Sequence, residues 1–376
     1  MALLPLILLL IVAGSMVYCA LVLYAAQHYL SRKPETLGSP VPVSILKPLA
    51  GKDEGLEGNL RSFFEQDYPD FELLFAVRRT DDPAVPVVEA LRRQYPRISS
   101  RLIVTGEPPY PNAKVFSLRH MIEAAQNELL VMSDSDVRVT PEMLRVIAAE
   151  FQDSRLGLAT CPYRAAPGRS LWSRLEAVGM NTEFLSGILV ARIVEGMRFA
   201  VGPTIAARRA AIDAIGGIER VKDYLAEDFV LGRLVHDSGW GVGLSSYVIE
   251  HRIGSQPFGD NMRHRLRWAR STRRSRPSGY AGQLFTNPLP LALILTAVSP
   301  SWWPVLAATA GLRALAAWAA AWLVLKDKLT ARQWWLLPVQ DILSFFFWIA
   351  GFFGNTIVWR GRTYYLRSDG RFILVR

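Results

Sequence analysis

The sequence predicts an α/β domain with a mainly parallel sheet, tethered to a membrane by apolar segments at both of its ends. Residues 2–31 contain no Asp, Glu, Lys or Arg, and charge-poor segments return after residue 277. Between them, short β-branched runs alternate with helical patterns about ten residues long, which is typical of βαβ units and a parallel sheet. We therefore expect a charged domain over residues 40–276, with membrane segments before and after it.

The N-terminal segment, residues 1–31, is predicted to be an uncleaved transmembrane anchor. It is long enough to span a bilayer, and it lacks the preceding basic region and the evident cleavage site of a signal peptide. Arg32 and Lys33 follow it at once. Because basic residues favour the cytoplasmic side, we expect an integral membrane protein with its N-terminus outside and domain 40–276 in the cytoplasm.

Residues 283–359 contain the C-terminal membrane segments, and a basic tail of residues 360–376 follows them. With the anchor, the charge-poor segments allow about four spans by length. Three spans after the domain would leave the tail outside, against the positive-inside rule. We therefore predict a cytoplasmic tail and a re-entrant or interfacial segment at 334–359, which contains Pro338 and the run 351–354. The tail arginines are Arg360, Arg362, Arg367, Arg371 and Arg376.

Charge and cysteine content exclude two classes of function. The formal net charge is +10, but much of the excess lies beside the membrane segments, where it meets anionic headgroups. We therefore expect no nucleic-acid partner. Cys19 and Cys161 are the only cysteines, one in the anchor and one in the domain, so neither a disulfide framework nor a cysteine-based metal site can be built.

Short apolar runs separated by Pro, Gly and Asp define the elements of the domain. The predicted strands are 40–48, 71–77, 101–105, 128–132 and 156–163, with another after residue 204, and the predicted helices are 56–64, 84–94, 115–126 and 226–234. No GxGxxG follows the first strand and no GxxxxGKS/T occurs, so glycine-rich phosphate loops are absent. A nucleotide bound here would need a metal ion and basic side chains to hold its phosphates.

Asp134 and Asp136 directly follow the fourth predicted strand. In an open α/β sheet, ligands bind outside the carboxyl ends of the strands, which is where these two carboxylates fall. Two carboxylates can hold a hard divalent cation, and the cation can hold a diphosphate. A solvated turn is the alternative interpretation. Thr140-Pro141-Glu142 predicts the N-cap and first residue of the next helix.

Further candidates lie on both sides of this pair. Asp81 and Asp82 follow the second strand, and Asp228 opens helix 226–234, where an acid can also simply favour the helix dipole. Residues 170–198 have helical apolar spacing, which indicates either packing on the core or an interfacial helix that admits a lipid. A basic helix precedes residue 277. Its face carries Arg263, Arg267, Arg270 and Arg274, and we expect this face to seat the domain on anionic lipid.

The order of these signals resembles the membrane-bound family 2 glycosyltransferases. The likeness is closest to the ceramide glucosyltransferase group, which includes bacterial relatives that glycosylate hopanoids, and it covers nearly the whole chain. The segments that carry it are Ser44-Ile45-Leu46-Lys47-Pro48-Leu49, Phe64-Glu65-Gln66-Asp67-Tyr68-Pro69, Asp82-Pro83-Ala84, Ser133-Asp134-Ser135-Asp136-Val137-Arg138-Val139, Glu227-Asp228 and Arg267-Trp268.

The resemblance implies a GT-A-type fold and an enzyme that moves glucose or N-acetylglucosamine from a UDP-sugar, with inversion, to a lipid hydroxyl. Asp81 or Asp82 would contact the uracil and ribose, and the sequence leaves open which. Asp134 and Asp136 would hold the diphosphate through Mg²⁺ or Mn²⁺. Asp228 would be the general base that accepts the proton of the acceptor hydroxyl. The likeness to bacterial relatives also implies the bacterial inner membrane.

The remaining residues of the implied nucleotide-sugar site are Lys114, His264, Arg267 and Trp268. Arg267 and Trp268 match the Arg-Trp of the family motif that closes over the diphosphate. His264 departs from the motif, which usually has Gln or Arg there. An imidazole can still donate one hydrogen bond to a phosphate, and a protonated one adds charge.

Two other classes share parts of this pattern. A processive polysaccharide synthase has the same acidic and Arg-Trp motifs, but it needs more spans than the roughly four available here to build a polymer channel. A catalytically inactive membrane scaffold would not need an acid at every motif position. The acceptor stays open among ceramide, diacylglycerol and hopanoid, because each presents a hydroxyl at the membrane surface.

Overall fold

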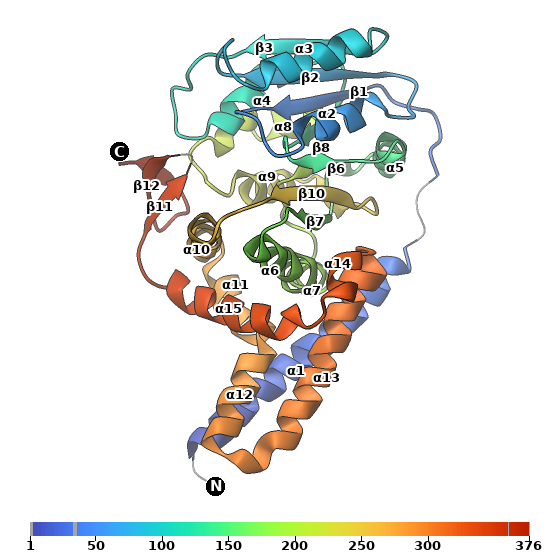
Figure 1. The fold of residues 1–376 in the computed structure, drawn as a ribbon. Coiled ribbons are helices and arrows are strands. Elements are labelled where there is room, and N and C mark those ends of the chain that lie inside the picture. The colour runs from blue at the N-terminus through green and yellow to red at the C-terminus, as the bar shows by residue number, and fades with distance from the viewer. Residues whose placement is uncertain (1–2, 33–35, 360, 376) are drawn as a thin grey trace. The chain divides into compact units, whose positions relative to one another are not determined.

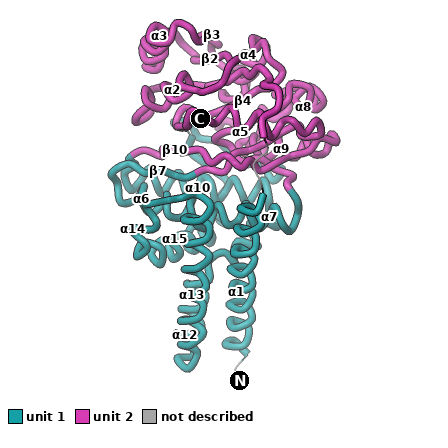
Figure 2. Tube along the Cα trace, turned by 90° about the vertical axis from the view of Figure 1, so that its right-hand side faces the viewer, with its two compact units in different colours: residues 1–32, 164–196, 255–369 teal, residues 33–163, 197–254, 370–376 magenta. Residues whose placement is uncertain are grey.

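A computed structural model of the chain describes residues 3–32, 36–359 and 361–375. Lys33, Arg360 and Arg376, on which the orientation predictions partly rest, lie outside these residues. The chain forms two compact units, shown in Figure 2. The helical unit comprises residues 1–32, 164–196 and 255–369, and the sheet unit comprises residues 33–163, 197–254 and 370–376. Segments 164–196 and 255–276, placed by the sequence in one domain with the sheet, thus group with the membrane helices.

The sheet unit contains a seven-stranded sheet in the order β3-β2-β1-β4-β8-β6-β9 (Figure 1). Its strands are β1 (Val43–Pro48), β2 (Phe71–Val77), β3 (Ser99–Val104), β4 (Leu129–Ser133), β6 (Leu156–Thr160), β8 (Thr204–Arg208) and β9 (Gly241–Leu244). Only β8 runs antiparallel to its neighbours β4 and β6. The predicted mainly parallel sheet is therefore confirmed, and its first four strands are those expected.

The central strands are buried over nearly their whole length. Ile45 in β1 lies between Leu73 in β2 and Val131 in β4, and all three side chains are inaccessible to solvent. Helices cover the sheet, which is why these strands read as continuous apolar runs. The helices are α2 (Leu56–Phe64), α3 (Val85–Gln94), α4 (Ala113–Ala124), α5 (Met143–Glu150), α8 (Arg209–Ala214) and α9 (Glu227–Asp237), with the short η2 (Ile218–Val221).

Two sequence predictions in this unit are wrong in detail. The strand predicted over 156–163 ends at Thr160, and a separate strand β7 (Tyr163–Pro167) begins beyond Pro162, which has no N–H to continue a ladder. Thr140 does not cap a helix, because α5 begins at Met143. Instead, the backbone N–H and the hydroxyl of Thr140 both contact the Tyr247 hydroxyl at 2.7 Å.

The helical unit contains three helices long and apolar enough to cross a membrane, by length and composition, among the described residues. They are Leu3–Leu30, Leu171–Val194 and Pro300–Val324, and a fourth arises if Pro277–Thr286 and Pro288–Val298, bent by 60°, form one span. Figure 1 shows α1 (Leu3–Leu30), α12 (Pro288–Val298) and α13 (Trp303–Trp318) side by side. Most of Leu171–Val194 is buried within the protein, which favours the packing interpretation of segment 170–198.

Helix α15 (Leu336–Gly351) has 16 residues, or about 24 Å of helix, less than the roughly 30 Å of a bilayer core. In Figure 1 it lies across the direction of α1, α12 and α13. Both features support the predicted re-entrant or interfacial character of 334–359.

The remaining elements of the two units are β5 (Val137–Arg138), α6 (Leu171–Gly179), η1 (Met180–Phe184), α7 (Leu185–Val194), β10 (Ile249–Gly254), α10 (Phe258–Ser275), α11 (Pro277–Gly282), η3 (Gln283–Thr286), η4 (Pro300–Trp302), η5 (Ala319–Val324), α14 (Lys328–Arg332), β11 (Thr356–Trp359), β12 (Arg362–Leu366) and β13 (Phe372–Leu374).

Candidate functional site

The acidic turn of residues 134–136 is fixed by backbone contacts on both sides. The N–H of Asp134 donates to the Pro203 carbonyl oxygen at 2.9 Å, beyond the end of β4. Strand β5 begins directly after the turn and pairs with β10, so that Val137 lies opposite His251. The turn therefore connects strands of two different sheets, and its two carboxylates, each about one-third exposed, have defined surroundings.

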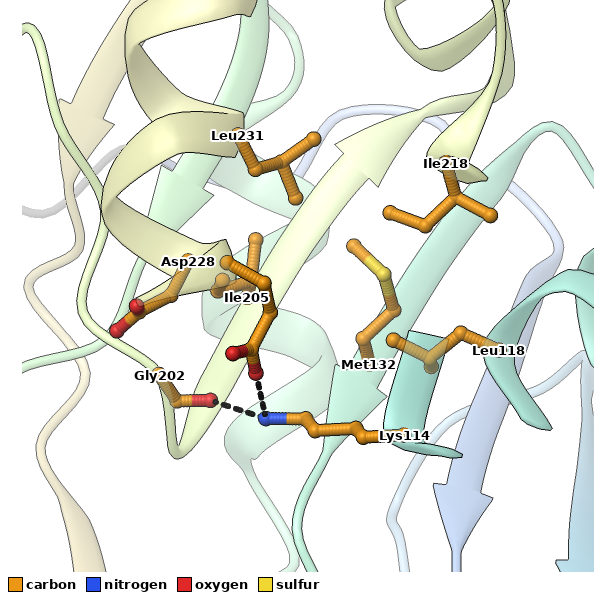
Figure 3. Close-up of a pocket in the computed structure, with 9 residues that line it drawn as sticks. Lys114, Leu118, Met132, Gly202, Ile205, Ile218, Asp228 and Leu231 are labelled. Atoms are coloured by element: carbon orange, nitrogen blue, oxygen red, sulfur yellow. Dashed lines mark hydrogen bonds and ion pairs between the residues drawn. The ribbon is translucent and has the colours of Figure 1, made fainter. Parts of the chain in front are cut away.

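Lys114 connects the acidic turn to the start of α9. Its ammonium lies 2.7 Å from Asp134 Oδ1 and 3.2 Å from Glu227 Oε1, and it also donates to the Gly202 carbonyl oxygen (Figure 3). Burial by itself lowers the pKa of Lys114, but the charges of Asp134 and Glu227 outweigh it and hold that pKa above its usual range. Lys114 is therefore a permanent cation in the site.

Asp136 retains an unused ligand atom. Its Oδ2 lies 3.1 Å from His251 Nε2, whereas its Oδ1 is buried without a hydrogen-bond partner. Burial raises the pKa of Asp136, but His251 and Lys47 together hold it below the usual value. An ionised carboxylate with a free buried oxygen is suited to a divalent cation. Within the described residues, no group of three or more His, Cys, Asp and Glu could hold a metal ion.

Asp228, the second residue of α9, lines a pocket together with Lys114 and Glu227 (Figure 3). A Cβ on Gly202 would approach Asp228 Oδ2 to 2.9 Å, so the glycine leaves room for the carboxylate. Burial, followed by the charge of Glu227, raises the pKa of Asp228 to about 7. A carboxylate with such a pKa can accept a proton efficiently near neutral pH.

Asp81 and Asp82 differ in their surroundings. The carboxylate of Asp81 is exposed and paired with Arg79, at 2.7 and 2.8 Å. The carboxylate of Asp82 accepts hydrogen bonds from the backbone N–H of Gly51 at 3.1 Å and of Ala84 at 2.9 Å. Asp82 therefore ties the loop after β1 to the loop after β2, at the carboxyl ends of two adjacent parallel strands.

Lys47 is a candidate that the sequence reasoning did not assign a role. It is fully buried in β1, and its ammonium donates to Ser133 Oγ and the Asp134 carbonyl oxygen. The ammonium also lies 3.8 Å from the centroid of the Phe63 ring. Burial lowers the pKa of Lys47 to about 7. The sequence signal was a single Lys in a mostly apolar strand.

His264, Arg267 and Trp268 lie on α10, in the helical unit. His264 Nδ1 lies 2.7 Å from Glu176 Oε1, and the ring centroid of Trp268 lies 5.5 Å from that of His264 and 5.7 Å from that of Phe184. Glu176 is buried and also accepts from Asn261 Nδ2 at 2.6 Å. Sequence reasoning missed Glu176, because its helix reads as a packing segment.

Arg270 and Arg274 contact protein where the sequence suggested lipid. Arg270 Nε donates to the Phe353 carbonyl oxygen at 3.0 Å, and its Nη1 donates to that of Thr356. Arg274 donates to Asn355 Oδ1. These two arginines therefore tie α10 to the segment that follows α15, and their seating of the domain on lipid stays a prediction.

Comparison with known proteins matches residues 7–372 to the model of glycosyl transferase family 21. Two similar relatives are ceramide glucosyltransferases 1 and 3 of Caenorhabditis elegans. The first is 28% identical over 227 residues, covering 60% of this chain and 47% of the relative, and the second is 26% identical over 246 residues, covering 65% and 53%. The chain thus spans about half the length of these curated relatives.

A solved structure with a similar fold is a mannosyltransferase from Pyrobaculum calidifontis, in complex with GDP-Man and Mn²⁺. Its TM-score is 0.56 at 18% sequence identity, covering 93% of this chain and 97% of that chain. At this identity the likeness shows the fold alone. It confirms the predicted GT-A-type fold.

Proposed function

Because the chain belongs to glycosyl transferase family 21, we propose that it transfers one sugar, glucose or N-acetylglucosamine, from a UDP-sugar to the hydroxyl of a membrane lipid. The observation that carries this proposal is the contact of Lys114 with both Asp134 and Glu227. This contact joins a diphosphate-holding turn to the helix that carries a proton acceptor. Similarity to ceramide glucosyltransferases supports a ceramide-like acceptor.

Asp228 is the proposed general base. Direct displacement at the anomeric carbon needs a group that accepts the proton of the acceptor hydroxyl on the face opposite the leaving diphosphate. Asp228 has the raised pKa that this role requires, and it stands at the pocket beside Gly202. Transfer would then proceed in a single displacement with inversion, without a covalent sugar–enzyme intermediate.

Asp134 and Asp136 would hold Mg²⁺ or Mn²⁺, to which the buried, unpartnered Oδ1 of Asp136 is suited. When bound, the cation would neutralise charge on the leaving diphosphate. Lys114 fixes the orientation of the Asp134 carboxylate, and Lys47 donates to the Asp134 carbonyl oxygen in the backbone of the turn. We assign nucleoside contact to Asp82 in preference to Asp81, because Asp82 orders the loops at the ends of β1 and β2.

The proposed membrane topology rests on the tail and on α15. Gly370–Arg376 belongs to the same compact unit as the sheet, so we place the tail on the same side of the membrane as the site. An even number of crossings then lies between them, which fits two spans built around α12 and α13 and an α15 too short to cross. Arg32 supports a cytoplasmic position for that side.

Transfer assays in nanodiscs test the proposal. The full chain is incubated with UDP-glucose, UDP-N-acetylglucosamine or GDP-mannose and with ceramide, diacylglycerol or a hopanoid, and the lipids are analysed by mass spectrometry. We expect one UDP-sugar to yield a lipid with a single added hexose or N-acetylhexosamine, with the opposite anomeric configuration by NMR. A soluble polymer, or transfer from GDP-mannose alone, would contradict the proposal.

A further inference from the structure

The C-terminal tail returns to the sheet unit and contacts the loop that leads into α9. The N–H of Phe372 donates to the Asp223 carbonyl oxygen at 2.9 Å, and the Phe372 side chain is 2% exposed. Arg371 forms an antiparallel bridge with Tyr224, and its guanidinium lies 5.6 Å from the centroid of the Tyr224 ring. Backbone and side chains of the tail thus fix residues 223–224 together.

Tyr224 is in turn bonded to the start of α4. Its carbonyl oxygen accepts from Asn112 Nδ2 at 2.9 Å, and Asn112 is inaccessible to solvent. Asn112 Oδ1 caps α4 by accepting from the Val115 N–H, and Asn112 Nδ2 also lies 3.4 Å from Glu227 Oε2. A single buried amide therefore touches the tail-held loop, the helix that carries Lys114 and the acid beside Asp228.

Only a few residues connect the tail contacts to Lys114 and Asp228 in the candidate site. Lys114 is the second residue of α4 and bonds Asp134 and Glu227, and Asp228 lies four residues after Tyr224 in the chain. A shift of the 223–226 loop would displace the first turn of α9 and the Asn112 amide at the same time. Catalytic geometry is sensitive to displacements of about 1 Å.

We propose that the C-terminal tail is a positioning clamp, in which Phe372 and Arg371 hold the 223–226 loop so that Asp228 faces the acceptor. The clamp rests on the proposed role of Asp228. It is also encoded after the membrane segments, so the site is complete only when those segments have been inserted and the tail has reached the side of the sheet unit.

The test compares Phe372→Asp with Ile373→Asp in the full chain. Both place one carboxylate in the tail, but Ile373 is 49% exposed whereas Phe372 is buried. For Phe372→Asp we expect kcat to fall at least about tenfold while the KM for the UDP-sugar changes less than about twofold. Phe372→Leu and Ile373→Asp should behave as wild type. Equal effects of both Asp variants would overturn the clamp.

A disulfide distinguishes a clamp from a general folding defect. Tyr224→Cys and Arg371→Cys place two thiols at an antiparallel bridge, where Cα atoms about 4.5–5.5 Å apart can be joined. The native Cys19 and Cys161 are both buried. Oxidation should restore kcat to Phe372→Asp in this double-cysteine background, and reduction should remove the rescue. An oxidised protein that stays slow would overturn the proposal.

Hydrogen exchange separates the clamp from the proposed function. In Phe372→Asp, residues 223–230 should exchange faster than in wild type while β1 and β2 are unchanged, and Ile373→Asp should match wild type. This result does not depend on any transfer reaction. If no acceptor is glycosylated by the wild type but the exchange difference is present, the clamp holds and the assigned activity fails. Unchanged exchange at 223–230 would overturn the clamp alone.

Discussion

In the helical unit, Arg313 on α13 and Asp341 on α15 form a bidentate pair at 2.8 and 2.7 Å, and Arg313 also donates to Thr182. Within this pair each charge has one opposite partner, and Glu183 is a further acid close enough to interact with both. In the sheet unit, four carboxylates, those of Asp134, Asp136, Glu227 and Asp228, share the buried Lys47 and the half-buried Lys114. The pair is balanced in charge, whereas the cluster carries excess negative charge.

The difference indicates what each group is for. A balanced, fully bonded pair inside apolar helices fixes how those helices pack and needs no ligand. In the cluster, burial and neighbouring carboxylates raise the pKa values of Asp134 and Asp228, whereas His251 and Lys47 hold that of Asp136 below its usual value. Leaving such a site empty costs free energy, because its carboxylates repel one another. A bound cation or an added proton reduces that repulsion.

Breaking the balanced pair should give the largest effect, on stability. Arg313→Ala leaves Asp341 buried and unpartnered, so we expect a loss of about 3–5 kcal/mol in the free energy of unfolding. Arg313→Met combined with Asp341→Leu removes both charges and should recover most of that loss. Denaturant titration in detergent measures both. A double variant as unstable as the single one would contradict a purely structural pair.

Removing the proposed base should affect catalysis without affecting stability. Asp228→Asn is expected to lower kcat by at least about 100-fold, since it deletes the proton acceptor, while UDP-sugar binding changes little. Asp237→Asn, near the other end of α9 and exposed, is the matched control. Binding is measured by calorimetry and transfer by mass spectrometry. More than about a tenth of the wild-type rate in Asp228→Asn would exclude a general-base role.

The pH dependence of kcat/KM should reveal the excess negative charge around Asp228. Because the pKa of Asp228 is raised to about 7, its active, deprotonated form increases with pH, and kcat/KM should rise about tenfold per unit below that value and level off above it. Glu227→Gln removes a neighbouring negative charge and should move the midpoint to lower pH. A midpoint that stays in place would show that Glu227 does not raise this pKa.

The smallest expected effect concerns Glu176, a single buried acid that accepts from both His264 and Asn261. Glu176→Gln keeps an acceptor but removes the charge that orients His264, so we expect the KM for the UDP-sugar to rise about fivefold with kcat nearly unchanged. Glu195→Gln, an exposed change in the same unit, serves as control. Identical kinetics in the two variants would leave Glu176 with a packing role only.

Much of the sheet unit could be predicted from local sequence. Residues 71–77 form an apolar run interrupted only by Glu72, and β2 has those bounds, because a strand buried on both faces has little polar alternation to blur its limits. The acidic pair after β4 could be placed by the general position of ligands in α/β sheets. Asp228 could be placed at a helix start, but its raised pKa depends on burial that no local pattern shows.

The rest depended on contacts between distant segments. Thr140 has the sequence of an N-cap, yet its hydroxyl is hydrogen-bonded to that of Tyr247, which lies more than a hundred residues later in the chain. The sequence does not show that the carbonyl oxygens of residues 353 and 356 accept hydrogen bonds from Arg270. Asn112 looks like an ordinary loop residue, and only the fold brings it to Tyr224 and Glu227. Partners of this kind follow from tertiary structure.

The most direct test of the unbalanced cluster is UDP binding measured by calorimetry with and without divalent cation. With Mg²⁺ or Mn²⁺ present, we predict that the full chain binds UDP at least about tenfold more tightly than in chelator, because the cation lets two carboxylates hold a diphosphate. Asp136→Asn should abolish that difference, whereas Asp81→Asn should retain it. Equal UDP affinity in cation and in chelator would contradict the account.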